Sequence, residues 1–269
     1  MARAQERMRR VGVLMNTAES NPEGQARFVA LRQRLQDLGW RQDHDIRIDV
    51  RWGGGDVARI RDHAEALVGL SPDVLLAYAG AQLAALSRAT RSIPIVFIGV
   101  SDPVTPGYVA SFARPGGHIT GFTLYEASLG SKWLATLKEI APAIARAALM
   151  ANPDTALLGG RHFTRAFEIS ASGLAVEPIA ADIRSVGDIE AAMAELGRSG
   201  GGVIVVPESF TSTHRELIVR LAAEHRVPAM YPLRQFTTDG GLMLRARQHR
   251  YDPPFGGVYR PHTARRETY

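Results

Sequence analysis

The stretch Ser92–Val104, with the sequence SIPIVFIGVSDPV, decides the fold class. It contains a continuous apolar run that stops in Ser-Asp-Pro, the pattern of a buried strand followed by a polar loop. Continuous apolar strands are typical of parallel sheets, because helices cover both faces of each strand. The stretch therefore predicts a parallel strand whose carboxyl end presents Ser101 and Asp102.

The segments on either side of this strand alternate between strand and helix patterns. Strands are predicted at 11–16, 45–52 and 73–80, with amphipathic helices between them and before residue 93. A connector rich in Gly and Pro is predicted at 111–123, and the same alternation then restarts. Strands separated by helices indicate βαβ units around a parallel sheet. We therefore expect an α/β fold with two Rossmann-like lobes, 11–120 and 121–243, and a cleft between them.

Polar residues follow the apolar strands of both predicted lobes. Ligands of such sheets bind beyond the carboxyl ends of the strands, and a cleft between lobes is a favoured place for a small molecule. Each polar residue is equally well explained as a cap of the next helix, but its recurrence in both lobes favours a ligand held from two sides. These residues are Asn16, Ser101, Asp102, Asn152 and Glu208.

Two tyrosines, Tyr78 and Tyr231, are candidate aromatic walls of the cleft. Each is equally well explained as a core ring with its hydroxyl at the edge. The segment 208–214, ESFTSTH, combines Ser, Thr and His. Its favoured interpretation is a loop and a helix cap by Ser212 or Thr213, because capping is the common use of these residues.

Composition and motifs exclude several classes of function. The chain has no cysteine, and it lacks the glycine patterns of dinucleotide and phosphate loops, the G-x-S-x-G of hydrolases and the H-E-x-x-H of zinc enzymes. We therefore expect no enzyme activity, no cofactor and no metal. The formal charge is +5, but residues 1–10 carry +3 and residues 245–269 carry +4, so the rest carries −2. Because residues 11–244 carry no excess of basic side chains, the sequence argues against nucleic-acid binding.

Taken in order along the chain, a set of segments resembles one family. The segments are RRVGVLMN, DVRWGGGD, ATRSIPIVFIGVSDPV, GYVASFARPGGHITGFT, KWLATLKEIAP, ANP, GGVIVVPESFTSTHRELI and VPAMYPLRQF. Together they span about Met8 to Met243 and are similar to the substrate-binding proteins of ATP-binding-cassette (ABC) importers, of the tryptophan/tyrosine type with a type I periplasmic-binding-protein fold.

The resemblance implies two lobes that close on a small solute, often an aromatic amino acid. It implies a membrane permease as partner, a periplasmic location, a monomer and no catalysis. By position, it places Asn16, Ser101, Asp102, Thr123, Asn152 and Glu208 at the cleft. A hydroxyl residue common in the family is replaced by Gly80, whose backbone N–H would have to substitute. The predicted solute is therefore broader: a small polar or aromatic compound, an amino acid or related.

The two ends depart from the family pattern. The start, MARAQERMRR, is similar to the last piece of a secretion signal, so we expect residues 1–10 to be a signal remnant and the product to be exported. Residues 244–269 are basic and aperiodic, which predicts a poorly ordered tail. The segment YRPHTARRET can be encoded by codons that, when read one nucleotide later, give IDRILRGEKP. This is the motif that the family has near its C-terminal end. A frameshift near Leu244 is therefore our hypothesis.

Two alternatives differ in testable ways. A cytoplasmic ligand-sensing domain on the same fold would normally carry a helix-turn-helix before the first strand, where this chain has only ten residues before Val11. An α/β enzyme would need a nucleophile–base pair or a cofactor loop, which the motifs do not supply.

Overall fold

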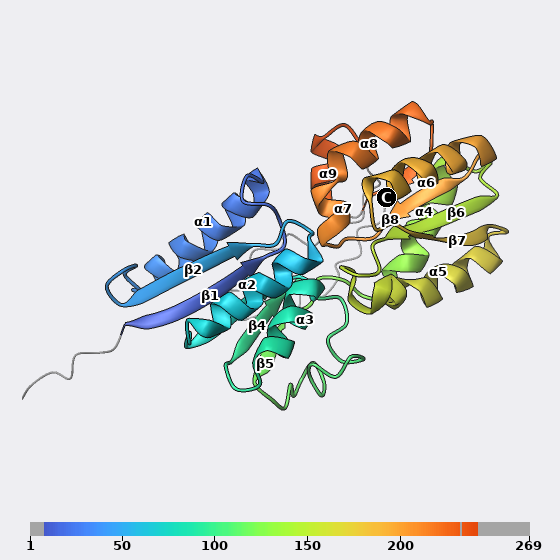
Figure 1. The fold of residues 1–269 in the computed structure, drawn as a ribbon. Helices are drawn as coiled ribbons and strands as arrows, with labels where there is room; N and C mark the ends of the chain where they lie inside the picture. The colour runs from blue at the N-terminus through green and yellow to red at the C-terminus, as the bar shows by residue number, and fades with distance from the viewer. Residues whose placement is uncertain (1–7, 232, 242–269) are drawn as a thin grey trace, which may run out of the picture.

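The structure is a computed structural model that describes residues 8–231 and 233–241. Two parallel sheets lie side by side, each flanked by helices (Figure 1). We call the part built on the first sheet the first lobe and the part built on the second sheet the second lobe. The predicted fold class, two Rossmann-like lobes with parallel sheets and flanking helices, is confirmed.

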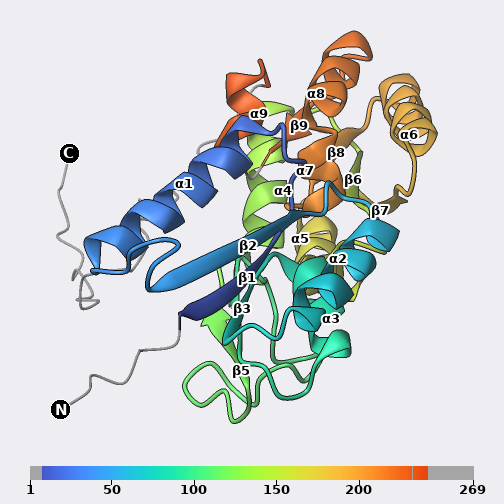
Figure 2. The ribbon, with the colours of Figure 1, turned by 60° about the vertical axis from the view of Figure 1, so that its left-hand side comes forward.

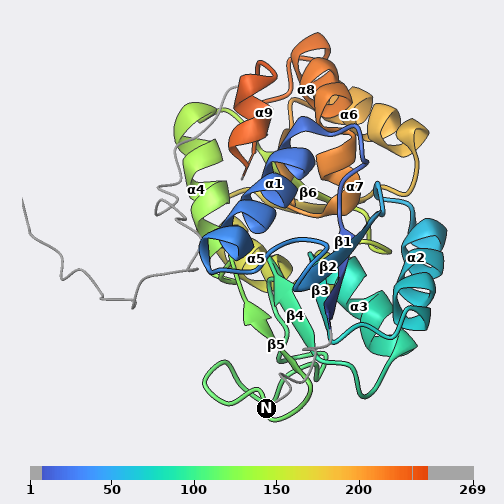
Figure 3. The ribbon, with the colours of Figure 1, turned by 90° about the vertical axis from the view of Figure 1, so that its left-hand side faces the viewer.

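The first sheet has the strand order β2-β1-β3-β4-β5, and all its pairings are parallel. Its strands are β1 (Arg9–Met15), β2 (Ile46–Trp52), β3 (Val74–Tyr78), β4 (Ile95–Ile98) and β5 (Ile119–Phe122). Helix α1 (Pro22–Asp37) lies over one face, and α2 (Val57–Gly69) and α3 (Gly80–Ala89) lie over the other (Figure 3). The carboxyl ends of all five strands therefore meet at one edge.

The second sheet has the order β7-β6-β8-β9, again with parallel pairings. Its strands are β6 (Arg146–Ala151), β7 (Glu177–Asp182), β8 (Gly202–Val205) and β9 (Ala229–Met230). The helices of this lobe are α4 (Leu129–Ile140), α5 (Arg161–Gly173), α6 (Val186–Ser199), α7 (Ser209–Thr213), α8 (Arg215–Glu224) and α9 (Arg234–Thr238), with a 3₁₀ turn η1 (Leu157–Gly160) before α5. Two apolar clusters, one on α4 and α5 and one on α6 and α8, cover its two faces.

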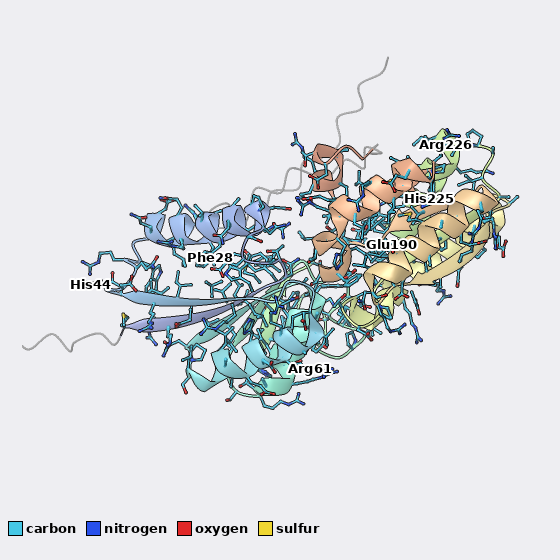
Figure 4. All side chains as sticks on the ribbon, turned by 45° about the horizontal axis from the view of Figure 1, so that its top comes forward. Phe28, His44, Arg61, Glu190, His225 and Arg226 are labelled. Atoms are coloured by element: carbon cyan, nitrogen blue, oxygen red, sulfur yellow. The ribbon has the colours of Figure 1, made fainter. Side chains whose placement is uncertain are left out.

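Local sequence explains where the helices begin. Asn21 caps α1 by accepting from the Gly24 N–H at 2.9 Å, with Pro22 at the first helical position. Asp56 caps α2 in the same way through the Arg59 N–H at 3.0 Å. On the inner side of α1, Phe28 lies against Trp52 with ring centroids 6.1 Å apart (Figure 4). The cap fixes the start of the helix, and the ring contact fixes the face it turns to the sheet.

Four segments differ from the predictions. The connector at 111–123 contains β5, which pairs with β4, so the predicted lobe boundary after residue 120 falls inside a strand. Helices α7 and α9 are short and were not predicted, because five residues are too few to show helical periodicity. The signal remnant was predicted at 1–10, but Arg9 and Arg10 belong to β1 and pair with β2. The rest of that prediction up to residue 7, residues 242–244 of the last strand predicted near 240–244, and the tail predicted at 244–269 lie outside the described residues. Among the described residues, no helix combines the length and apolarity needed to cross a membrane.

Candidate functional site

The carboxyl edges of the two sheets face each other (Figures 1 and 2), and segments that follow β2, β3 and β4 each contact a helix or helical turn of the second lobe there. A methyl group built on Gly55, after β2, would be 3.2 Å from the Phe210 Cα of α7. One built on Gly80, after β3, would be 2.7 Å from the Leu157 Cβ of η1. The third pair is Asp102, after β4, and His162 of α5. The cleft predicted from the sequence therefore lies where the lobes meet.

A pocket of about 910 Å³ opens beside the third pair. Asp102 Oδ2 and His162 Nδ1 are 3.6 Å apart, and their side chains are 16% and 14% exposed. The pocket is lined from the first lobe by the loop after β4 and from the second by η1 and α5. Its lining residues are Asp102, Thr105, Ala127, Pro153, Leu158, Arg161, His162, Arg165, Ala166 and Ile169.

Asp102 is held as a carboxylate by its own loop. Its Oδ1 accepts from the backbone N–H groups of Val104 and Thr105, each at 3.0 Å. Burial alone would raise the pKa of Asp102, but hydrogen bonds from Thr105 and Val104, together with the nearby His162, bring the pKa below its usual range. Because Oδ1 is occupied by these donors, Oδ2 is the oxygen that faces His162 across the pocket.

Three buried polar side chains near the end of β1 and in α3 have atoms without a hydrogen-bond partner among the described residues. The atoms are Asn16 Oδ1, Thr17 Oγ1 and Gln82 Nε2, and the three residues are 8%, 4% and 0% exposed. Gln82 also reaches the other lobe, since the Ser209 hydroxyl donates to its Oε1 at 3.4 Å. Buried polar atoms are normally paired, so this group is prepared for a polar partner.

Glu208 serves as a helix cap in this structure. Its carboxylate accepts from the N–H groups of Phe210 at 2.5 Å and Thr211 at 2.7 Å, and from the hydroxyl of Thr155. Burial raises its pKa, although these hydrogen bonds act in the opposite direction. Capping of α7 by Glu208 matches one of the two roles left open for this residue. The predicted cap by Ser212 or Thr213 is wrong: α8 has no side-chain cap, and the Thr213 hydroxyl donates to the Ser209 carbonyl at 2.8 Å.

Asn152 also binds its own loop. Its Oδ1 accepts from the Asp154 N–H at 2.8 Å, an Asx turn that ends β6, and only 4% of the residue is exposed. Ser101 and Thr123 are half-buried at the ends of β4 and β5, on the edge that faces the other lobe. Their contact with a solute stays a prediction.

The two candidate aromatic walls lie in different surroundings. Tyr78 is half-buried at the end of β3, packed against the apolar cluster beneath α1. Tyr231 is 2% exposed and stacked on Phe236, with centroids 4.9 Å apart, inside the core of the second lobe. Burial raises the pKa of Tyr231 well above its usual range. This placement matches the alternative of a core ring.

Several residues of this region were not predicted as site residues. Thr17 and Gln82 escaped because one polar residue in an apolar helix pattern carries no motif. The pocket residues of α5, Arg161, His162 and Arg165, follow no apolar strand directly. The available signal was the spacing of Arg165, which lies four positions after Arg161 and three after His162, so that each pair shares a helix face. Among the described residues, no group of three His, Cys, Asp or Glu side chains is arranged to hold a metal ion.

Comparison with known proteins identifies one family. The family profile described as "ABC transporter substrate binding protein" matches residues 11–246. A tyrosine-binding protein of Clostridioides difficile (strain R20291) is 32% identical over 91 residues, which is 34% of this chain and 26% of that protein. The chain therefore matches about a quarter of that relative's length.

Two solved structures have the same fold at low sequence identity. A conserved domain protein of Vibrio cholerae has a TM-score of 0.77 at 22% identity, covering 87% of this chain and 77% of that chain. An ABC domain of Streptococcus pneumonia in complex with L-Trp also has a TM-score of 0.77, at 16% identity over 88% of this chain and 79% of that one. These likenesses, with the family profile, confirm the resemblance seen in the sequence.

Proposed function

Because this chain belongs to the family of ABC transporter substrate-binding proteins, we propose that it binds a small polar or aromatic solute, an amino acid or a related compound, in the cleft between its lobes. The observation that carries the proposal is the meeting of two carboxyl edges beside a pocket of about 910 Å³. That volume lies in the range of small-molecule sites. The tyrosine-binding relative and the L-Trp complex support an aromatic amino acid as the first solute to test.

The binding groups in this proposal come from both lobes. Asn16, Ser101, Asp102 and Thr123 act from the first lobe, and Asn152 and Glu208 act from the second. Both sets contact the solute at once only when the lobes are close together, so binding favours the closed arrangement. Tyr78 supplies an aromatic wall, and Gly80 supplies backbone N–H groups when Leu157 moves away from it.

The proposed partner is the membrane permease of an ABC importer, which receives the solute from the closed form. The proposed location is the periplasm, with the protein exported as a monomer that carries out no chemistry. A cytoplasmic ligand sensor is the alternative. Cell fractionation separates the two, because the sensor stays with cytoplasmic markers and the importer component does not. Conversion of the solute by the purified protein would favour an enzyme instead.

The experiment is thermal unfolding of the purified full chain with tyrosine, tryptophan, other amino acids and small aromatic acids. A solute that binds only the native state, and is present at about 100 times its Kd, raises the free energy of unfolding by about 2.7 kcal/mol. For a chain of this size this corresponds to roughly 5–10 °C in Tm. We expect one class of solute to give such a shift, with a matching Kd by calorimetry. A sharp transition that no solute moves would contradict the proposal.

A further inference from the structure

We propose that the pocket beside α5 recognises a carboxylate on its solute through Arg161 and Arg165, so that the solute is a small acid with an apolar or aromatic body. This inference rests on the proposed function, because it names the chemical class of the solute. It assigns recognition of the carboxylate to a helix of the second lobe, whereas the strand ends supply the other contacts. Figure 2 shows α5 at the junction of the lobes.

The two arginines are one helical turn apart on α5, and both line the pocket. Side chains four residues apart lie on the same face of a helix, so their guanidinium groups can reach one anion. Neither has an ion-pair partner among the described residues. The neighbouring Arg184 differs in this respect, since its Nε is 3.3 Å from Asp154 Oδ2. Arg161 and Arg165 are therefore free to bind a charged solute.

The charge of the lining favours an anion. Asp102 is the single carboxylate among the lining residues, and its Oδ1 already accepts two backbone hydrogen bonds. Two guanidinium groups against one engaged carboxylate leave an excess of positive charge. His162 also lines the pocket, and its buried Nε2 has no hydrogen-bond partner among the described residues. Guanidinium groups bind planar carboxylates in a bidentate way, which gives geometric selection as well as charge.

The rest of the lining favours an apolar body over a bare inorganic anion. Ala127, Leu158, Ala166 and Ile169 contribute aliphatic surface to the same pocket. Ile169 is 66% exposed and lies two positions from each of the buried core residues Phe167 and Ala171, on the other side of α5. A solute with a ring or a branched chain would cover this surface while its carboxylate meets the arginines. Small aromatic and branched-chain acids match both the two arginines and the aliphatic surface of the pocket.

The test compares each acid with a counterpart that lacks the carboxylate, by calorimetry on the full chain. The probes are 3-phenylpropionate, 3-phenylpropionamide, L-tyrosine, tyramine and inorganic phosphate. The variants are Arg161→Gln, Arg165→Gln and the double variant. Arg220→Gln is the matched control, because Arg220 is an exposed arginine on α8 outside the pocket. Far-UV circular dichroism and the Tm confirm that each variant is folded.

We expect each acid to bind more tightly than the counterpart that lacks its carboxylate. Each single variant should weaken acid binding by about tenfold to a hundredfold, the effect of one hydrogen bond to a charged group. Amide binding and the Arg220→Gln control should stay within about twofold of the wild type, a change of under half a kcal/mol. Equal binding of acid and amide, or an unchanged acid Kd in the double variant, would overturn the carboxylate proposal and leave solute binding intact.

Two further outcomes are decisive. Tight binding of phosphate without the organic acids would replace the proposed class with an inorganic anion. Absence of binding by all probes, together with a Tm that no solute of the wider panel moves, would reject the proposed function itself. The two failures are thus distinguishable.

Discussion

Leu157 of the second lobe covers Gly80 of the first lobe, so closely that a methyl group built on Gly80 would be 2.7 Å from the Leu157 Cβ. Gly80 begins α3, and Leu157 begins η1, so the contact joins the loops after β3 and β6. Leu157 also packs against the apolar core cluster of the first lobe. The arrangement of the two lobes in this structure therefore depends on the absence of a side chain at position 80.

The first prediction concerns this contact. Gly80→Ala should lower the free energy of unfolding by about 1–3 kcal/mol, the usual cost of overpacking a well-packed site. Leu157→Ala should lower it as well, because it removes apolar burial. The double variant should be more stable than the sum of the single changes predicts, since the smaller side chain at 157 makes room for the methyl group. Urea unfolding of the four proteins measures this coupling.

Gly69→Ala is the matched control for the first prediction. A methyl group at Gly69, in α2, would have no atom within 4 Å. Gly69→Ala should raise the free energy of unfolding by up to about 1 kcal/mol, because alanine has a higher helix propensity than glycine. Additive effects of Gly80→Ala and Leu157→Ala would show that the two residues do not contact each other in solution.

The second prediction concerns the buried amide of Gln82. Gln82 is 0% exposed, its Nε2 has no hydrogen-bond partner among the described residues, and its Oε1 has a long 3.4 Å contact with Ser209. Gln82→Met should raise the free energy of unfolding by about 1 kcal/mol, because an unpaired buried polar group is costly. If the amide binds the solute, the same variant should also lose affinity in calorimetry. A variant that is both less stable and unchanged in affinity would contradict this account.

The sequence predicted the sheets more completely than it predicted the site. Continuous apolar runs such as Ile95–Ile98 identify parallel strands directly, and Asn21 and Asp56 mark helix starts. The polar residues that follow the strands lie at the edge that faces the other lobe, as expected. The connector was only partly predicted, because the glycines around β5 mask a strand of four residues.

The pairing of loops across the lobes could not be predicted from one sequence. Contacts such as Leu157 with Gly80, or Ser209 with Gln82, join residues that are 77 and 127 positions apart. No local periodicity encodes such a contact. For the same reason, the sequence explained Glu208 equally well as a helix cap and as a ligand-binding residue, because both roles use one carboxylate at the end of a strand. The structure assigns its oxygens to α7 and Thr155.

The third prediction concerns Asp102 and pH. The pKa of Asp102 in the folded protein is below its ordinary value of 3.8. A carboxylate of this kind contributes stability that is present above the unfolded pKa and is lost as pH falls through the folded pKa. Asp102→Asn should therefore be less stable than the wild type by about 1 kcal/mol at pH 6, where a hydrogen bond to a charged group is lost.

The same difference should shrink as the pH falls below 3.8, the ordinary value for this carboxyl. Urea unfolding of both proteins from pH 7 down to pH 3 measures it. Thr105→Val is the companion variant, because it removes the Thr105 hydroxyl, which lowers the pKa of Asp102, and leaves the carboxylate in place. A difference between wild type and Asp102→Asn that grows on acidification would show that the loop does not stabilise the charged form.

The last prediction concerns Glu208, whose pKa shift has the opposite sign. Burial raises its pKa above the ordinary value of 4.5, so its contribution to stability is full below pH 4.5 and is lost as pH rises through the folded pKa. Glu208→Gln has no such dependence, and its amide oxygen still accepts from α7. The wild type should therefore lose stability relative to Glu208→Gln as the pH rises from 4 to 8. Thr155→Val removes a hydrogen bond that lowers the pKa of Glu208, so it should move this loss to higher pH. Urea unfolding of the three proteins at each pH measures these differences. If the wild type instead gained stability relative to Glu208→Gln as the pH rises, the capping hydrogen bonds of α7 would stabilise the charged form of the buried carboxylate, and the predicted pKa shift would be wrong.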